Sequence, residues 1–253
     1  MSVAAQLRDF PRGNHSTPAN LGLALLAVDE VTEARRVLEA AHLANPDHEA
    51  VTQQLAIARA RSGATNAALE LTRQWTAAHP DDAAALQIEA DVRAALHDFA
   101  GAEAAVRRAL TLKPSDIPLH VALGTYLAAQ GQAAAAQASF EQSLQTLGDR
   151  AEIQHNLARL LLTAADLQAR HPDRALTLAR SLVTSHVTAP RLETLALALA
   201  ETGNWEQAAS VVGRAAAALG EDGSTSLRRR VARVRAAIQS KTHFREAWPF
   251  ADE

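Results

Sequence analysis

The pattern of apolar and polar positions along the chain favours helices. β-Branched runs that alternate with polar residues, which would indicate strands, are not evident. Alanine dominates the apolar residues, and it is the best helix former, with a side chain small enough for helices to pack closely. We therefore expect an all-α chain with essentially no β-sheet.

Turn residues divide the chain at a regular interval. Pro46, Pro80 and Pro114 lie 34 residues apart, and Gly148 takes the next place in the series. Self-similarity at such a fixed period is the sequence signature of stacked helix pairs. The interval predicts six repeats, over residues 15–48, 49–82, 83–116, 117–150, 151–188 and 189–222.

Small residues recur in register with these turns. Twelve residues before each of the four turn residues stands an alanine, at Ala34, Ala68, Ala102 and Ala136. Near the middle of each first helix lies another small residue, at Gly22, Ala56, Ala90 and Gly124. Such residues let two antiparallel backbones approach where the helices cross, and larger apolar residues fill the space beside them. The larger residues are Leu38, Val106 and Phe140.

The ends of the expected helices carry residues that suit turns. The residues between the two helices of a repeat are Asp29, Gly63, His97 and Gly131. Proline after each second helix stops that helix. Polar residues that follow the proline are expected to accept hydrogen bonds from the free amides of the next helix. These candidates are Asp47, Asp81, Asp82 and Ser115.

The fifth repeat departs from the regular length. Its stretch between helices, roughly residues 164–173, is about five residues too long. Insertions in repeat arrays lie on one face of the array, and some of them bind partners. Extra loop length also costs little entropy, so the longer turn can be either a functional insertion or variation that the fold tolerates.

The segment after the repeats predicts one more helix, over residues 223–240. Four apolar residues, at positions 227, 231, 234 and 238, form one stripe along it. Five arginines are expected off this stripe, namely Arg228, Arg229, Arg230, Arg233 and Arg235. A solenoid exposes its last apolar face unless a polar-backed helix covers it, so we expect this helix to be a cap. Residues 1–14 precede the repeats, and residues 241–253 form a tail.

The 34-residue pattern resembles the tetratricopeptide repeat family over residues 15–222. The resemblance implies a right-handed superhelical solenoid of antiparallel helix pairs. It also implies a concave groove lined by the first helices, to which fixed positions of each repeat point. The partner-binding residues that we expect in this groove are Gln53, Gln87, Asp91, Thr125, His155, Asn156, Arg159 and Glu193.

The chain departs from the family in two respects. The bulky aromatic residue usual early in the first helix is missing, and so is the Lys and Asn set with which some members clamp a peptide carboxylate. Asn156 and Arg159 could hold one carboxylate, with the arginine giving a bidentate pair. The alternative is that both are ordinary solvated residues.

Composition narrows the classes of partner. The net charge of −3 gives no general reason to expect nucleic acid or a membrane surface. Because cysteine is absent, disulfides and thiolate chemistry are excluded. No run of about 18 apolar residues occurs, and the first residues do not read as a signal peptide. We expect a bacterial, cytoplasmic protein, or a periplasmic one if a leader is missing from the sequence.

Motifs of catalytic chemistry are missing. The chain has no GxGxxG, GxxxxGK[ST], HExxH or GxSxG pattern. Its histidines are scattered; His42 and His48, for example, lie on either side of Asn45-Pro46 and cannot share a helix face. We therefore expect no enzyme activity, no metal and no cofactor.

These observations favour a scaffold or adaptor that binds a partner protein or peptide along the groove. A substrate-recruiting subunit of a separate modifying enzyme is the alternative, and a structural subunit that self-associates is a third. The cap and tail offer a secondary surface, since arginines attract acidic groups and aromatic residues suit interfaces. Its residues are Arg228, Arg229, Arg233, Phe244 and Trp248.

Overall fold

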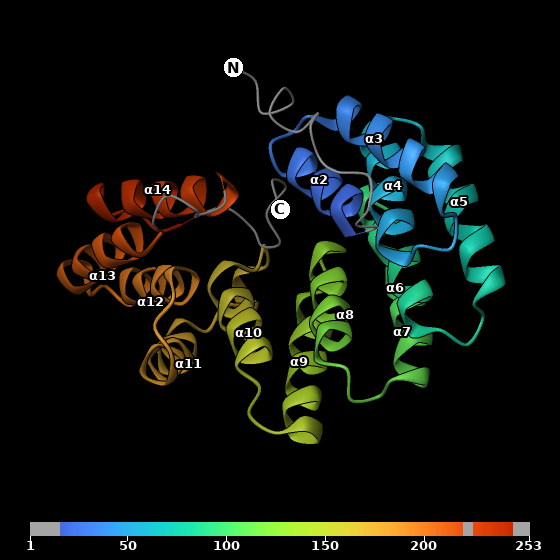
Figure 1. Ribbon diagram of the computed structural model, residues 1–253. Helices are drawn as coiled ribbons and strands as arrows, with labels where there is room; N and C mark the ends of the chain where they lie inside the picture. The colour runs from blue at the N-terminus through green and yellow to red at the C-terminus, as the bar shows by residue number, and fades with distance from the viewer. Residues whose placement is uncertain (1–15, 220–224, 245–253) are drawn as a thin grey trace, which may run out of the picture. The chain divides into compact units, whose positions relative to one another are not determined.

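The computed structural model describes residues 16–219 and 225–244, and every regular element within these ranges is a helix (Figure 1). The expectation of an all-α fold is thus confirmed. The chain divides into two compact units, unit 1 over residues 1–114 and unit 2 over residues 115–253. Each unit is a stack of helix pairs, and each is described by itself.

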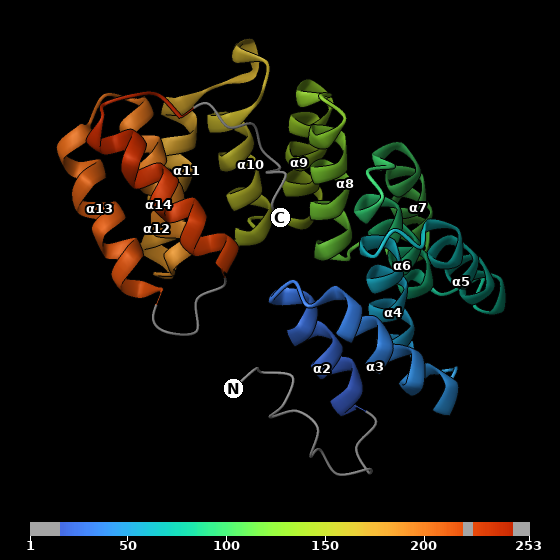
Figure 2. The same ribbon diagram turned by 90° about the horizontal axis from the view of Figure 1, so that it is seen from above.

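Unit 1 contains three helix pairs. They are α2 (Ser16–Ala27) with α3 (Val31–Ala44), α4 (Glu49–Arg61) with α5 (Thr65–Ala78), and α6 (Ala83–Ala95) with α7 (Phe99–Leu112). Each helix packs on the next along the chain, and α4 also packs on both α2 and α6. The first helices of the three pairs therefore form one continuous row (Figure 2).

Unit 2 repeats this arrangement and ends in a single helix. Its elements are α8 (Ile117–Ala129), α9 (Ala133–Leu147), α10 (Ala151–Thr163), the 3₁₀ turn η2 (Leu167–Ala169), α11 (Pro172–Ser185), α12 (Ala189–Glu201), α13 (Trp205–Ala218) and α14 (Thr225–Gln239). The first helices again pack in series, α8 on α10 and α10 on α12. The last helix, α14, packs on both α12 and α13 and so extends the row (Figure 2).

The helix pairs lie within the predicted repeat ranges, one pair to each. The division into repeats ending at residues 48, 82, 116, 150, 188 and 222 stays a prediction. The predicted capping segment contains α14, whose residues Val231, Val234 and Ile238 are buried. The apolar stripe of this segment therefore faces the helices beneath it.

Small residues stand where the helices cross, as the repeat pattern predicts. The four alanines of the second helices, from Ala34 to Ala136 in steps of 34 residues, are fully buried. A Cβ atom built on Gly22 would lie 2.5 Å from Leu38, and one built on Gly124 would overlap the ring of Phe140. Glycine is thus required at both crossings because a large apolar residue occupies the space opposite.

The turn between the helices of a pair has the same backbone shape in successive repeats. Asp29, Gly63, His97 and Gly131 all have positive φ angles, between 60° and 79°. In each case the N–H of the following residue donates to a carbonyl five residues earlier, as from Ala64 to Arg59 at 2.8 Å. This left-handed turn satisfies carbonyl groups at the end of the first helix. Two of the four positions accommodate it without glycine.

The helix caps differ in part from the prediction. Each first helix after a proline begins three residues beyond it, so its N-cap is the second residue after the proline. Asp82 is correctly predicted, because its carboxylate accepts from the Ala84 N–H at 2.9 Å. Ser115 and Asp47 come one residue too early. The caps there are Asp116, which accepts from the Leu119 N–H at 3.1 Å, and His48, which makes no side-chain capping bond.

Candidate functional site

Two polar surfaces lie along the rows of first helices. We define the first-helix face of unit 1 by Gln53, Gln87 and Asp91. The first-helix face of unit 2 is defined by five further residues, Thr125, His155, Asn156, Arg159 and Glu193. All eight stand on α4, α6, α8, α10 or α12, which are the first helices of their pairs.

The face of unit 1 is polar and joins neighbouring helices. The amide nitrogen Nε2 of Gln53 on α4 donates to Oδ2 of Asp91 on α6 at 2.9 Å. Gln87 lies one helical turn before Asp91 and is partly buried. The face thus combines amide donors and acceptors with one carboxylate, which are groups able to pair with a peptide backbone.

His155 connects two first helices of unit 2. Its Nε2 lies 2.8 Å from the hydroxyl oxygen of Thr194 on α12. That hydroxyl also lies 3.1 Å from the carbonyl of Pro190, to which it can donate its single hydrogen. In that arrangement His155 Nε2 carries the proton of the neutral ring and donates to the hydroxyl.

Glu193 and Arg230 form a buried ion pair between α12 and α14. The distance from Glu193 Oε1 to Arg230 Nε is 3.4 Å, and the two residues are only 1% and 7% exposed. The other carboxylate oxygen of Glu193 is buried and makes no hydrogen bond among the described residues. Arg159, on α10, is also buried, at 8% exposure.

The electrostatic environment of His155 is positive. Burial lowers its pKa to about 4, and the nearby charges of Arg159, Arg230 and Arg191 contribute to the same shift. A positive charge on the imidazole is disfavoured both by loss of hydration and by repulsion from these guanidinium groups. His155 is therefore neutral near pH 7.

This lowered pKa predicts a pH-dependent stability. The unfolded chain, with a histidine pKa near 6.5, binds a proton before the folded chain does, so stability falls as the pH drops below 6.5 and levels off below about 4. We expect a loss on the order of 2 kcal/mol from this residue between pH 7.5 and pH 5. His155→Gln, which can still donate to Thr194, should lack this part of the dependence. Urea unfolding of both proteins at the two pH values measures the difference, and equal pH dependence would contradict it.

Two of the selected residues bond within their own helices. Thr125 donates to the carbonyl of Val121 at 2.8 Å, and Asn156 donates to that of Glu152 at 2.8 Å. The prediction that Asn156 and Arg159 bind one carboxylate together stays a prediction. In this structure the amide of Asn156 is hydrogen-bonded within its own helix.

The arginines of α14 divide between its surfaces. Arg228 and Arg229 are exposed and Arg233 is partly buried, whereas Arg230 is buried against Glu193. The expectation that Arg230 lies off the apolar stripe is therefore wrong. The sequence spacing does indicate this burial, because position 230 is three residues after Leu227 and four before Val234, on the same helix face as both. Trp248 lies outside the described residues.

The described end of the chain is held by two side chains from elsewhere in unit 2. Phe244 is buried, and its N–H donates to Glu201 Oε1 at 2.7 Å. Arg170, in the long turn of the fifth pair, donates to the Phe244 carbonyl at 3.1 Å and to the Ala164 carbonyl at 2.8 Å. The extra residues of this turn thus supply a contact that anchors the segment after α14.

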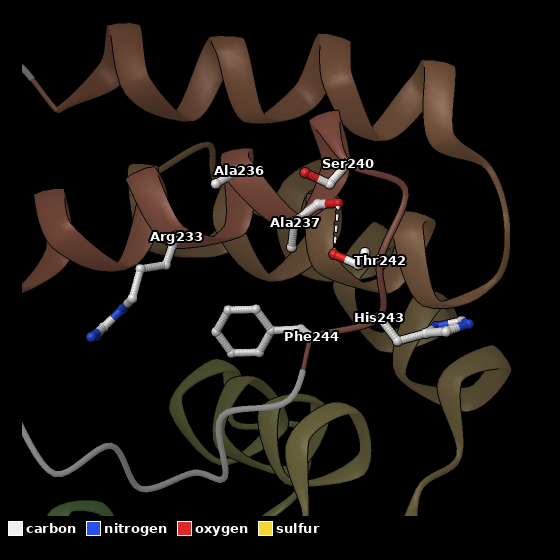
Figure 3. A pocket seen from close by; sticks show the side chains of 7 residues that line it. All are labelled: Arg233, Ala236, Ala237, Ser240, Thr242, His243 and Phe244. Carbon is white, nitrogen blue, oxygen red and sulfur yellow. Dashed lines mark hydrogen bonds between the residues drawn. The ribbon is translucent and has the colours of Figure 1, made fainter.

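A shallow pocket of about 400 Å³ lies beside this anchor (Figure 3). In Figure 3 the ring of Phe244 lies below α14, and the side chain of His243 points the opposite way. The lining residues are Arg233, Ala236, Ala237, Ser240, Thr242, His243 and Phe244. Two of them are ionisable, Arg233 and His243, and the Nδ1 of His243 lies 2.9 Å from Glu201 Oε2.

The described residues form neither a metal-binding group nor a membrane-spanning helix. Within residues 16–219 and 225–244 no three histidine, aspartate or glutamate side chains are grouped to hold a metal ion. None of the helices in these ranges is both long and apolar enough to cross a membrane.

Comparison with known proteins identifies the fold. No protein-family model matches the chain, and no curated protein matches it. Among solved structures, a thermophilic tetratricopeptide repeat protein of Thermus thermophilus is 25% identical, with a TM-score of 0.53 over 68% of this chain and 92% of that one. A tetratricopeptide repeat protein of Parabacteroides merdae is 15% identical, with a TM-score of 0.61 over 90% of this chain and 89% of that one. PilF of Pseudomonas aeruginosa is 19% identical, with a TM-score of 0.56 over 90% of this chain and 97% of that one. Taken with the stacked helix pairs and their 34-residue spacing, these matches show that the chain has the fold of tetratricopeptide repeat proteins.

Proposed function

We propose that the chain is a non-enzymatic scaffold or adaptor that binds a partner protein or peptide on its first-helix faces. The observation that carries the proposal is the bridging of adjacent first helices by polar side chains. Gln53 bonds to Asp91 across α4 and α6, and His155 bonds to Thr194 across α10 and α12. Such groups are fixed in place before a ligand arrives, which lowers the entropy lost on binding.

The repeat architecture explains why a ligand would be long rather than small. Each first helix contributes only a few side chains to its face, and the next helix continues the row. An extended or helical peptide can contact several helices of one unit at once. A small molecule would meet only one or two of them, and the Figure 3 pocket is open and shallow.

One serine–histidine pair could suggest hydrolytic chemistry, and its geometry argues against that. The hydroxyl of Ser143 lies 2.8 Å from His120 Nδ1, but it also lies 2.8 Å from the Ser139 carbonyl, which can only accept. The carbonyl thus competes with the ring for the hydroxyl hydrogen, which makes the ring a poor base for this serine. Ser143 is also buried, beyond the reach of a substrate.

Selection from a random peptide library tests the proposal. Peptides selected on the immobilised full chain should bind at least tenfold more weakly when the face residues Gln87, Asp91 and Arg159 are changed together to alanine. Gln142→Ala and Arg180→Ala, on the exposed sides of α9 and α11, serve as controls and should change affinity less than twofold. If the triple variant binds the selected peptides as the natural chain does, the first-helix faces are not the binding surface.

A further inference from the structure

The chain turns back after its last helix. Lys241, just beyond α14, has a positive φ of 49°, and the Thr242 N–H donates to the Ala237 carbonyl at 2.9 Å. The turns between paired helices have this same left-handed shape, so the chain reverses here as it does inside a repeat. We define the returning segment as residues 242–244, and Figure 3 shows it passing below α14.

Side chains from two other parts of unit 2 hold the returning segment. Glu201, the last residue of α12, accepts from the Phe244 N–H at 2.7 Å, and its other oxygen lies 2.9 Å from His243 Nδ1. Arg170 donates both to the Phe244 carbonyl at 3.1 Å and to the Ala164 carbonyl, just beyond α10, at 2.8 Å. The returning segment therefore runs from α14 past the end of α12 to the end of α10.

The returning segment lies on the side of unit 2 that carries the first-helix face. Phe244 lines a pocket with Arg233, which follows Arg230 by one helical turn on α14. Arg230 is the residue that pairs with Glu193 of the face. On α12, Glu201 follows Glu193 by two helical turns along the same stripe. The described part of the chain therefore ends beside the face.

The residues that follow Phe244 have the reach and the composition of a ligand for this face. They are Arg-Glu-Ala-Trp-Pro-Phe-Ala-Asp-Glu, residues 245–253, and they lie outside the described residues. An extended chain of this length spans about 30 Å, whereas α10 is about 20 Å long. Trp248 and Phe250 are of the aromatic type that is enriched at interfaces, and Pro249 between them favours an extended backbone.

We propose that residues 245–253 bind along the first-helix face of unit 2, so that the chain's own tail occupies the surface that a partner would use. The inference rests on the proposed function and adds its regulation, because a partner then binds unit 2 by displacing the tail. A segment tethered next to its site has an effective concentration of about 1 mM. A second copy of the chain, or a free peptide, at micromolar concentration therefore competes poorly with it.

Disulfide trapping tests the position of the tail on the full chain, which has no cysteine of its own. Asn156→Cys places one thiol on the face, and Ala251→Cys places another in the tail. Mild oxidation should join them within one chain, because a disulfide needs Cα atoms within about 7 Å of each other. The matched control combines Ala251→Cys with Arg180→Cys, exposed on α11, and should form about tenfold less disulfide. Non-reducing electrophoresis and mass spectrometry of digested protein measure the yields.

A gain of binding tests what the tail does to a partner. Peptides are selected from a random library on the full chain carrying Trp248→Ala and Phe250→Ala, and their affinities are measured by fluorescence anisotropy. They should bind this double variant about tenfold more tightly than the natural chain, since the tail no longer competes. Ala247→Ser keeps both rings, and its affinity should stay within about twofold of that of the natural chain.

Three results would overturn the proposal. The first is equal trapping at positions 156 and 180, and the second is trapping only between two chains, which would place the tail on a second copy. The third is a double variant that binds the selected peptides no more tightly than the natural chain. If binding still needs the face residues Gln87, Asp91 and Arg159 in any of these cases, the scaffold function stands and only the role of the tail fails. If trapping at position 156 succeeds and binding does not need those residues, the position of the tail stands and the scaffold function fails.

Discussion

Replacement of Gly124 by alanine is expected to lower the free energy of unfolding by about 3 kcal/mol. The added Cβ would overlap the ring of Phe140, which is fully buried. Overpacking of a closely packed core forces side chains off their rotamers and shifts the backbone. The better helix propensity of alanine, worth about 1 kcal/mol, is too small to offset this. Urea unfolding followed by far-UV circular dichroism measures the loss.

A helical glycine in open surroundings provides the matched control. A Cβ atom on Gly213, in α13, would meet nothing within 4 Å. Gly213→Ala should therefore raise stability by roughly 0.5–1 kcal/mol through propensity alone. The two glycine-to-alanine changes are thus expected to shift the free energy of unfolding in opposite directions. The difference between the two shifts measures the cost of the overlap with Phe140.

A second substitution should rescue the first. One repeat earlier, the positions equivalent to Gly124 and Phe140 are Ala90 and Val106, and both are fully buried. Phe140→Val alone leaves a cavity and should cost about 2–3 kcal/mol. Combined with Gly124→Ala it recreates the earlier pair, so the double variant should be more stable than the sum of the two losses implies. Additive losses would mean that Phe140 is not what excludes a side chain at position 124.

The fold was predictable because its determinants recur along the sequence. The turn-residue spacing and the alanines from Ala34 to Ala136 place the helix crossings of the first four repeats at the same point of a 34-residue unit. The left-handed turn was recognisable at Gly63 and Gly131, and register alone extends it to Asp29 and His97. The caps were harder to place. Which of two polar residues after a proline becomes the N-cap depends on how many residues the turn uses, and only the structure gives that number.

The site was less predictable because its key contacts join distant positions. Periodicity placed His155, Arg159 and Glu193 on first helices, but it could not pair Glu193 with Arg230 of α14. Arg230 belongs to a run of arginines in which composition alone favours exposure. The hydrogen bond from Arg170 to the Phe244 carbonyl spans 74 residues and depends on a turn that departs from the repeat. Such contacts follow from the stacking of whole helices, which a repeat pattern does not specify.

Glu193→Ala is expected to lower the free energy of unfolding by about 3 kcal/mol, because it removes a buried carboxylate that contacts the buried guanidinium group of Arg230. Glu70→Ala is the matched control. Glu70 and Arg73 are closer, at 2.7 Å, but both are largely exposed, so the unfolding midpoint should hardly change. In the double variant with Arg230→Met, much of the loss should return, since an apolar side chain needs no counter-charge.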